Sequence, residues 1–490
     1  MALEVLQGWG HVTASGSRVS RPVGTQGASA VEDAIRRSGG RGILVRGMGR
    51  SYGDAAQLAG GDVVELSQVS RLVRIDDEAA TVRAGGGVTI DHLLRLLVPR
   101  GWFLPVTPGT RHVSLGGAIA ADVHGKNHHA DGSIGSHLKT IELVSPTGRH
   151  TLFPQGPSAD VFWATVGGMG LTGAIIEAEL GLIPIEAASM TVRTERLDDL
   201  DDLLGAMAAR SSAHRYSVAW LDTLAPGARL GRSLLSLGHH STQAEVKALA
   251  RGLVRAKHSQ PERSSSWQAP PSLSWQAPTS LPVPRLPDRL LNASSARVLN
   301  AWRFRRTPTG PDPKLASLNA FFYPLDALSN WFRLYGRRGL LQYQFVVPFG
   351  AESVVQDCLE QLGGDEFPIF LAVLKTMGPR DLAPLSFPGP GWTLALDLAG
   401  GNPDLGPVLD RMDQRVAEAG GRVYLAKDCR MRPDLVSAMY PGLDQWRRTR
   451  AVVDPLGLFR SDLAHRLGLV PGPTPEPLDH PLGGDGKMRR

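Results

Sequence analysis

Three glycine-rich segments in the N-terminal part of the chain constrain the fold more than any other feature. They read VRGMGRSYGD (45–54), PVTPGTRHVSLGGAIAADVHGKNHHADGSIGS (105–136) and WATVGGMGLTGAII (163–176). Glycine permits a positive φ and a close approach of the backbone to a ligand, and loops with several exposed N–H groups form concave anion sites. A tight turn explains any one segment. The three together predict a domain that binds one large ligand with a pyrophosphate group.

The third segment contains the pattern G-x-G-x-x-G at Gly168, Gly170 and Gly173. A Rossmann dinucleotide site requires a strand before this pattern and a helix after it. The residues that follow, AIIEAELGLIPI, alternate in polarity and are rich in β-branched side chains, which predicts a strand. The pattern therefore argues against a nicotinamide site of the Rossmann type.

The second segment places three histidines and one lysine in HGKNHH (124–129). His124 and His128 have the i, i+4 spacing that puts two side chains on one helix face, but a zinc site requires a third ligand. Gly125 and the following HADG argue against a continuous helix, so we predict no metal site. For His128 or His129 the alternative is a structural role, with the imidazole bonded to backbone carbonyls.

Composition excludes several classes of function. The chain has 490 residues, of which 42% are hydrophobic and 20% charged, which is typical of globular proteins. The 53 basic and 47 acidic residues give a net charge of +6 and form no basic stripe, so we expect no nucleic-acid partner. The two cysteines, Cys358 and Cys429, exclude a disulfide framework and a cysteine zinc site. We find no signal peptide and no run of about 18 apolar residues, so we expect no membrane-spanning helix.

Strand and helix signals alternate through the N-terminal part and predict an α+β fold. VEDAIRRS and IDHLLRLLVPRG have helical spacing, whereas RGILVRG, GDVVELSQ and LVRIDDEAATVRAGGGVT have the pattern of strands. GSHLKTIELVSPTGRHTLF predicts a hairpin with its turn at SPTGR. The pattern changes near residue 188, where a strand and then an acidic helix begin, and we place a domain boundary there.

Residues 256–300 differ in composition from the rest of the chain. SWQAP occurs twice, at 266–270 and 274–278, within a stretch rich in Ser and Pro. We expect a flexible surface insertion. The alternative is that Trp267 and Trp275 anchor the insertion to a membrane interface or a partner.

Taken together, the glycine-rich segments resemble the flavoproteins of the vanillyl-alcohol-oxidase type, in which a dinucleotide lies extended in a domain unlike the Rossmann one. The loop RGMGRSYGD matches the pyrophosphate loop of that class. Members that attach the flavin covalently often carry a histidine where this chain has Tyr52, so the resemblance implies non-covalent FAD. It also implies a two-domain α+β fold of the PCMH type, with a substrate domain built on an antiparallel sheet.

Further segments resemble one family within this class, the decaprenylphosphoryl-β-D-ribose oxidases of actinobacteria. The similarity runs from Gly8 to Leu469 and includes HGKNHH, LQYQFVVP, GPRDLAPLSFPGPGW, YLAKDCR and VDPLGLFRSDLAHRL. It implies FAD-dependent oxidation of the 2′-hydroxyl of a polyprenylphosphoryl ribose to the 2′-keto compound. This is the first step of an epimerisation that supplies arabinose for cell-wall arabinan. The alternative is an aldonolactone or alditol oxidase of the same fold, which usually has a histidine in the first loop.

The resemblance also implies the domain boundaries of the chain and its interaction partners. The FAD-binding domain comprises residues 7–188 and is closed by 422–470, with the substrate domain at 189–421 and a disordered tail at 471–490. An NAD(P)H-dependent keto-reductase completes the epimerisation. A polyprenyl substrate implies peripheral contact with membrane lipid, and the sequence leaves open whether the cytoplasmic or the periplasmic face is used.

The resemblance assigns the cofactor contacts mainly to the three glycine-rich segments. The predicted FAD-binding residues are Arg46, Gly47, Met48, Gly49, Arg50, Ser51, Tyr52, Gly53, Pro108, Gly109, Thr110, Gly116, Gly117, Ala118, Ala121, Asp122, His124, Gly125, Asn127, His128, Gly132, Ser133, Gly168, Gly173, Ile175, Tyr424 and Lys427.

The predicted catalytic residues are Lys427, His124 and Tyr52. Alcohol oxidation requires a base for the hydroxyl proton, and Lys427 and His124 are the two candidates. Burial would lower the pKa of a lysine and make it a base, whereas a charged Lys427 would stabilise the reduced flavin or the substrate phosphate. We expect Asp428 to pair with Lys427.

Gln342 and Gln344 lie two residues apart on a predicted strand and therefore share one face. The spacing allows either a solvent-facing stripe or a pocket, and the resemblance favours the pocket. The predicted substrate-binding residues are Lys126, Asn127, Trp220, Phe322, Gln342, Gln344, Lys375 and Asp397.

Two positions depart from the family pattern. Ala395 stands where the mycobacterial form has a cysteine that covalent nitroaromatic inhibitors attack, so we predict that such inhibition fails here. Phe322 stands where the family has a tyrosine, which puts that hydroxyl contact in doubt.

Overall fold

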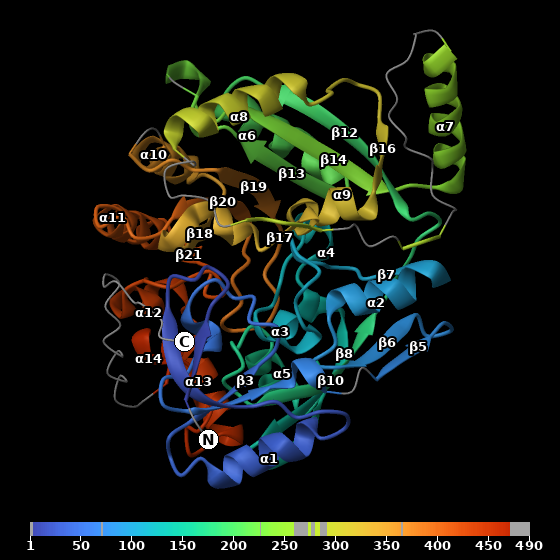
Figure 1. Ribbon diagram of the computed structural model, residues 1–490. Coiled ribbons are helices and arrows are strands. Elements are labelled where there is room, and N and C mark those ends of the chain that lie inside the picture. Colours follow the sequence, from blue (N-terminus) through green and yellow to red (C-terminus); the bar gives the residue numbers. More distant parts are fainter. Residues whose placement is uncertain are drawn as a thin grey trace, which may run out of the picture.

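The computed structural model describes residues 3–69, 72–225, 227–258, 273–275, 280–284, 292–363 and 366–470. Figure 1 shows two stacked parts, with two small sheets below and one large sheet above. Mixed helices and antiparallel sheets confirm the α+β class. Much of the predicted insertion and the whole predicted tail lie outside the described residues.

The first small sheet has the order β1-β2-β4-β3, and β2, β4 and β3 run parallel. The helix that follows β2 buries Val31 and Ala34 between this sheet and the second one, where they pack with Ile43 and Val64. The elements are β1 (Glu4–Gln7), β2 (Ala14–Ser20), α1 (Gly27–Arg37), β3 (Ile43–Arg46) and β4 (Asp62–Glu65).

The second small sheet is antiparallel, with the order β5-β6-β10-β8-β9. The hairpin predicted around SPTGR is present, because Ser145 pairs with Gly148 across the turn. The strand predicted after the G-x-G-x-x-G pattern is present as well. The strands are β5 (Val73–Asp76), β6 (Thr81–Gly85), β8 (Leu138–Ser145), β9 (Gly148–Leu152) and β10 (Ala174–Gly181).

Short helices connect these strands and carry the second and third glycine-rich segments. The helix that contains LGGAIA packs on β10 and β6, where Gly116 allows close contact with the backbone of Gly86. The elements are α2 (Ile90–Leu97), β7 (Trp102–Phe103), α3 (Leu115–Ala120), α4 (His128–Asp131), α5 (Ala159–Thr165) and β11 (Ile183–Pro184).

The large sheet has eight strands in the order β16-β12-β14-β13-β19-β20-β18-β21. Side chains of alternate residues divide it into two faces. On β18, Tyr343 and Phe345 join the core on the side of α6, α10 and α11, while Gln342 and Gln344 point to the opposite side. The strands are β12 (Ser189–Leu197), β13 (Tyr216–Leu221), β14 (Ser233–His240), β16 (Lys314–Ser317), β18 (Leu340–Val347), β19 (Leu371–Met377), β20 (Gly391–Ala399) and β21 (Arg422–Val423).

Helices pack on the large sheet, and a separate pair of strands forms a two-stranded parallel sheet. These elements are α6 (Leu200–Arg210), α7 (Gln243–His258), β15 (Leu281–Pro282), α8 (Ala293–Arg306), α9 (Leu318–Phe322), β17 (Leu328–Ser329), α10 (Glu352–Leu362) and α11 (Leu405–Glu418). The flexible insertion expected through residue 300 is wrong from Ala293 onward, because α8 begins there. Asn292 caps α8 by accepting from the N–H of Ser295, whose hydroxyl in turn accepts from the N–H of Asn292.

Trp275 packs against the core instead of facing outward. Its ring is partly buried and lies edge-on to Tyr323, with centroids 6.5 Å apart. This contact disagrees with the interfacial anchor considered for Trp275, while Trp267 lies outside the described residues.

The end of the chain returns to the lower part through α12 (Val436–Met439), α13 (Leu443–Val453) and α14 (Asp462–Arg466). Arg466 binds both oxygens of Asp54 at 2.9 Å and contacts Asp428 at 2.9 Å. This ion cluster joins the first glycine-rich loop to the YLAKDCR segment. The expected pairing of Asp428 with Lys427 is therefore wrong, since Asp428 faces a guanidinium from the last helix.

Candidate active site

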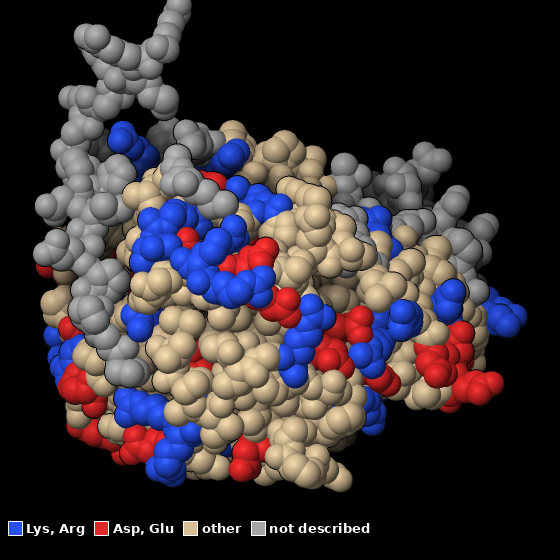
Figure 2. All heavy atoms as spheres, turned by 90° about the horizontal axis from the view of Figure 1, so that it is seen from below, with Lys and Arg blue, Asp and Glu red and all other residues tan. Residues whose placement is uncertain are grey.

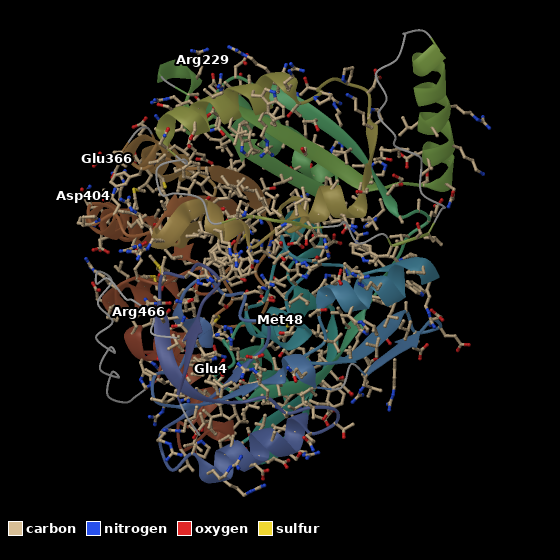
Figure 3. All side chains as sticks on the ribbon, in the orientation of Figure 1. Glu4, Met48, Arg229, Glu366, Asp404 and Arg466 are labelled. Atoms are coloured by element: carbon tan, nitrogen blue, oxygen red, sulfur yellow. The ribbon has the colours of Figure 1, made fainter. Side chains whose placement is uncertain are left out.

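A cavity of about 850 Å³ lies between the lower part and the face of the large sheet that carries Gln342 and Gln344. All three glycine-rich segments contribute to its lining. Met48, labelled near the centre of Figure 3, is one of the lining residues. The predicted site residues that line it are Arg46, Gly47, Met48, Gly49, Arg50, Ser51, Tyr52, Pro108, Gly109, Thr110, Gly116, Gly117, Ala118, Ala121, His124, Gly125, Lys126, Gly173, Ile175, Trp220, Phe322, Gln342, Gln344, Lys375, Tyr424 and Lys427.

The other predicted site residues are not part of this lining, and two of them bind neighbouring backbone groups. Asn127 donates to the carbonyl of Pro105 at 2.8 Å, and His128 accepts from the N–H of Gly378 at 3.0 Å. The residues of this group are Gly53, Asp122, Asn127, His128, Gly132, Ser133, Gly168 and Asp397.

The histidines after His124 have structural partners. Besides the bond of His128 to Gly378, His129 contacts the carbonyl of His214 at 2.9 Å through Nε2. Among the described residues, no group of three or more His, Cys, Asp or Glu side chains is placed to hold a metal. The structural alternative, an imidazole bonded to a backbone carbonyl, therefore agrees with the contact of His129, whereas His128 is bonded to a backbone N–H instead.

The glycine-rich lining fits a dinucleotide because it presents backbone rather than side chains. A Cβ at Gly47 would lie 2.0 Å from Ser114 Oγ, so only glycine lets these two loops meet. A Cβ at Gly109 or Gly170 would meet nothing within 4 Å, since both residues border the cavity. Exposed backbone beside such openings is the arrangement that binds a pyrophosphate.

Two residues that the sequence did not mark hold the glycine-rich loops in place, Trp9 at the first loop and Asp326 at the second. The guanidinium of Arg50 lies 3.9 Å from the ring centroid of Trp9, and the backbone N–H of Trp9 donates to the carbonyl of Ser51 at 2.8 Å. Asp326 accepts from the hydroxyl of Thr110 at 2.7 Å. Neither Trp9 nor Asp326 belongs to a glycine-rich motif, so no local signal marks them.

His124 is buried where the second glycine-rich segment meets β18 and β19. Its Nε2 lies 3.1 Å from Gln344 Nε2, and its Nδ1 lies 3.1 Å from Lys375 Nζ. Burial lowers the pKa of His124 well below its usual value, and the charge of Lys375 lowers it further. The imidazole is therefore neutral and carries one proton.

The hydrogen bonds around His124 decide which nitrogen holds that proton. Thr393 donates to the carbonyl of Phe345 at 2.9 Å, so its oxygen accepts from the Gln344 amide at 3.1 Å. The same NH₂ group donates its second proton to His124 Nε2. The ring proton is then on Nδ1 and faces the Lys375 amine, which accepts it only when unprotonated. Burial lowers the pKa of Lys375 to about 8, so the neutral amine that can accept this proton predominates only above that pH.

A second network starts from Gln342, directly across from Asp397 in the sheet. Gln342 donates to the Tyr52 hydroxyl at 3.3 Å and to Asp397 Oδ1, while Asp397 Oδ2 is buried without a hydrogen-bond partner. The Lys427 amine lies 3.9 Å from the Tyr52 ring centroid. Burial lowers the pKa of Lys427 to about 7 and raises that of Asp397 to about 7. Lys427 therefore has access to its neutral, basic form near neutral pH.

We call these two networks the polar end of the cavity, comprising Tyr52, His124, Gln342, Gln344, Lys375, Asp397 and Lys427. Lys126 lies next to it, with its amine bonded to the carbonyl of Phe321 and 4.6 Å from that ring. Burial lowers the pKa of Lys126 to about 7. The polar end and Lys126 together supply three amines and one carboxylate, that of Asp397, which suits a substrate that brings negative charge.

A further part of the lining is the apolar end, formed by side chains of β12, β13, β14 and α9. It comprises Val192, Val218, Trp220, Leu234, Phe321 and Phe322. Phe322 is buried against Tyr216 and Phe103, with ring centroids 5.0 and 5.1 Å apart. An enclosed apolar surface of this kind binds hydrocarbon.

No helix among the described residues is both long enough and apolar enough to cross a bilayer.

The comparisons with known proteins agree with this geometry. Residues 25–153, which include the first two glycine-rich segments, match the FAD-binding domain family. The protein is an FAD-dependent oxidoreductase that acts on a CH–OH group. The chain is 38% identical to the decaprenylphosphoryl-β-D-ribose oxidase of Mycolicibacterium smegmatis over 477 residues. These residues cover 95% of this chain and 97% of that protein. It belongs to the family of that oxidase.

Two further relatives mark the extent of the similarity. An uncharacterised protein of Streptomyces coelicolor is 38% identical over 384 residues, which cover 78% of this chain and all of that protein. An alditol oxidase of a Streptomyces species is 27% identical over 196 residues, or 40% of this chain and 46% of that enzyme. The similarity to the alditol oxidase is distant and covers less than half of either chain.

Proposed function

We propose that the protein oxidises the 2′-hydroxyl of decaprenylphosphoryl-β-D-ribose to the 2′-keto compound. The observation that carries the proposal is the pairing of two unlike ends in one cavity. The polar end has amines for a phosphate and amides for sugar hydroxyls, whereas the apolar end has room for hydrocarbon. The name of the mycobacterial relative supports the same substrate.

FAD held along the glycine-rich lining would supply the acceptor for the hydride that leaves C2′. We assign the accompanying hydroxyl proton to Lys427, because its pKa of about 7 leaves a neutral amine available. Loss of the hydride from carbon and of the proton from oxygen leaves the 2′-ketone, so the electrons and protons balance. His124 and Gln344 orient the sugar, and neutral His124 avoids repulsion with the protonated Lys427.

Lys126 and Lys375 are the cations that we assign to the substrate phosphate. Both amines have pKa values lowered by burial, to about 7 and about 8. An arriving phosphate favours their charged forms, because a nearby opposite charge stabilises the ammonium. Substrate binding is then accompanied by proton uptake at these side chains.

Three further parts of the proposal concern organisation. We propose that residues 7–188 and 422–470 form the FAD-binding domain and 189–421 the substrate domain, as the separate sheets suggest. We also propose that an NAD(P)H-dependent reductase consumes the ketone and that the enzyme works at a membrane face. The flavin is held without a covalent bond through the first loop, since Tyr52 replaces histidine there.

The test is anaerobic flavin reduction with the purified holoenzyme. We expect bleaching of the flavin absorbance by a polyprenylphosphoryl ribose, but not by its 2′-deoxy analogue or by an alditol. Reduction by an alditol or an aldonolactone at equal rate would contradict the proposal. Flavin that stays in the soluble fraction after acid precipitation would support non-covalent binding.

A further inference from the structure

Helix α8 has an outer face with an unusual amount of exposed apolar surface. Val298, Leu299 and Trp302 are 72%, 55% and 59% exposed. Scattered single apolar residues on a surface require no explanation, but three on one helix form a patch. The opposite side of α8 is buried through Ala296 and Phe304.

The inner side of α8 is fixed to the large sheet, so the exposure of its outer face does not reflect a loosely attached helix. Asn300 donates to the buried carboxylate of Asp222 at 2.9 Å, and Arg232 binds the same carboxylate at 2.6 Å. Arg196 donates to the carbonyl of Phe304 at 2.9 Å and closes the end of the helix. These contacts make α8 a rigid platform.

The charge on α8 has one sign. Residues 292–307 contain four arginines, at positions 297, 303, 305 and 306, and no Asp or Glu. Arg305 and Arg306 are exposed beside the apolar patch. Figure 2 shows the opposite end of the molecule, where Lys and Arg stand beside Asp and Glu. A basic helix with an exposed Trp and aliphatic side chains matches the surface chemistry of anionic lipid.

Helix α8 also borders the apolar end of the cavity. Arg303 and Thr307 belong to the cavity lining, and the Arg303 guanidinium lies 4.6 Å from the ring centroid of Trp220. Figure 1 shows α8 at the upper end of the molecule, away from the lower part. One helix therefore connects the cavity with the exposed patch.

We propose that the outer face of α8, defined by Val298, Leu299, Trp302, Arg305 and Arg306, docks on an anionic lipid bilayer. Docking places the apolar end of the cavity next to the lipid. The inference rests on the proposed function, because a polyprenyl chain must pass between the bilayer and the cavity. The aliphatic and indole groups enter the interface, and the arginines contact lipid phosphates.

The test is sedimentation of the FAD-loaded, full-length protein with vesicles. We compare pure phosphatidylcholine with an equal mixture of phosphatidylcholine and phosphatidylglycerol, in low and in high salt. We expect binding to the mixed vesicles only, weakened by salt. Two double variants should each lower the partition coefficient at least about tenfold. The first combines Val298→Ser with Trp302→Ser, and the second combines Arg305→Glu with Arg306→Glu.

The matched control is Val452→Ser with Leu456→Ser, two residues that are 66% and 69% exposed on the lower part. This variant should bind vesicles like the unmodified protein. Equal loss in the control, or no binding of the unmodified protein to either vesicle, would overturn the proposal. A docking partner that is a protein would also leave vesicle binding at background and overturn it.

A second measurement places α8 itself at the lipid. Bromine-labelled phosphatidylglycerol should quench tryptophan emission of the unmodified protein more than that of Trp302→Phe, although both bind. Equal quenching would overturn the proposed orientation.

The activity assay separates the two proposals, because a short-chain water-soluble substrate should be oxidised equally by all α8 variants. If that substrate is not oxidised by the unmodified protein either, the proposed function fails while vesicle binding still decides the docking.

Discussion

The polar and apolar ends of the cavity differ in how each side chain depends on its neighbours. At the polar end, Gln344 donates two hydrogen bonds, and each bond fixes the role of the next group in the network. At the apolar end, Val192, Val218 and Leu234 contribute surface that any hydrocarbon of suitable size can contact. Hydrogen bonds are directional and hydrophobic contact is not. Chemistry and orientation should therefore depend on the polar end, and chain-length preference on the apolar end.

Replacement of Lys427 should have the largest effect. Lys427→Gln removes the amine that we assign as base, so flavin reduction should slow by about 10²–10⁴-fold. Rapid-mixing absorbance measurements give this rate directly, and the flavin spectrum shows that the cofactor is still bound. Lys139→Gln, an exposed lysine on β8, is the control and should change nothing. A rate within a few fold of the native value would remove Lys427 from the mechanism.

Replacement of Gln344 tests whether the network sets the tautomer of His124. Gln344→Leu leaves His124 Nε2 without its donor, and a buried polar group left unpaired costs about 1–3 kcal/mol. We expect kcat/KM to fall about 10–100-fold, with a change in the imidazole ¹⁵N shifts that follows the tautomer. Gln414→Leu, on the exposed face of α11, serves as control. Unchanged ¹⁵N shifts in Gln344→Leu would contradict the assignment of the proton to Nδ1.

The pH dependence of flavin reduction tests the second network. Neutral Lys427 is the active form, so the rate should rise with pH through about 7 and then level off. The carboxylate of Asp397 raises the pKa of Lys427, so Asp397→Asn should move the inflection to lower pH. The rate at acidic pH would then increase by a few fold relative to the plateau. A shift to higher pH would show that Asp397 does not act on Lys427 by its charge.

The apolar end should affect binding of long chains without changing chemistry. Leu234→Ser replaces one buried aliphatic side chain of the lining, and such a loss is worth about 1–3 kcal/mol. We expect KM for a long-chain substrate to rise about tenfold, while KM for a short-chain substrate and kcat for both remain as they are. The ratio of the two KM values within one variant cancels differences in folding. An equal rise for both substrates would contradict the division between the two ends.

Local signals explain which parts of the site the sequence could predict. The glycine-rich loops were predictable because backbone freedom is a property of single residues and short turns. The common face of Gln342 and Gln344 follows from strand periodicity, and the structure places both at the cavity. Each of these inferences depends on neighbours within a few positions.

The remaining features depend on contacts between distant segments. Asp428 pairs with Arg466, and Arg50 stacks on Trp9, and no periodicity links such positions. Thr393 gains its role only because β20 lies beside β18, where its hydroxyl accepts from Gln344. Helix α8 was not predicted, because the flexible insertion inferred from the Ser- and Pro-rich composition was extended past Ala293, where the helix begins. The cap formed by Asn292 and Ser295 was the local signal that could have shown the boundary.

Introduction of a cysteine at position 395 should have the smallest effect on turnover. Ala395 lies on β20 opposite Gln344 and lines the cavity, and Cys is a small apolar side chain. Ala395→Cys should keep kcat within about twofold and make the protein a target for nitroaromatic compounds that label a cysteine there. Intact-protein mass spectrometry should show an adduct only in the variant. In the native chain, burial raises the pKa of Cys358 and of Cys429, which favours the protonated thiols over the reactive thiolates. An adduct on the native protein would mean that one of these thiols reaches the cavity, and labelling without loss of activity would mean that position 395 lies outside the substrate path.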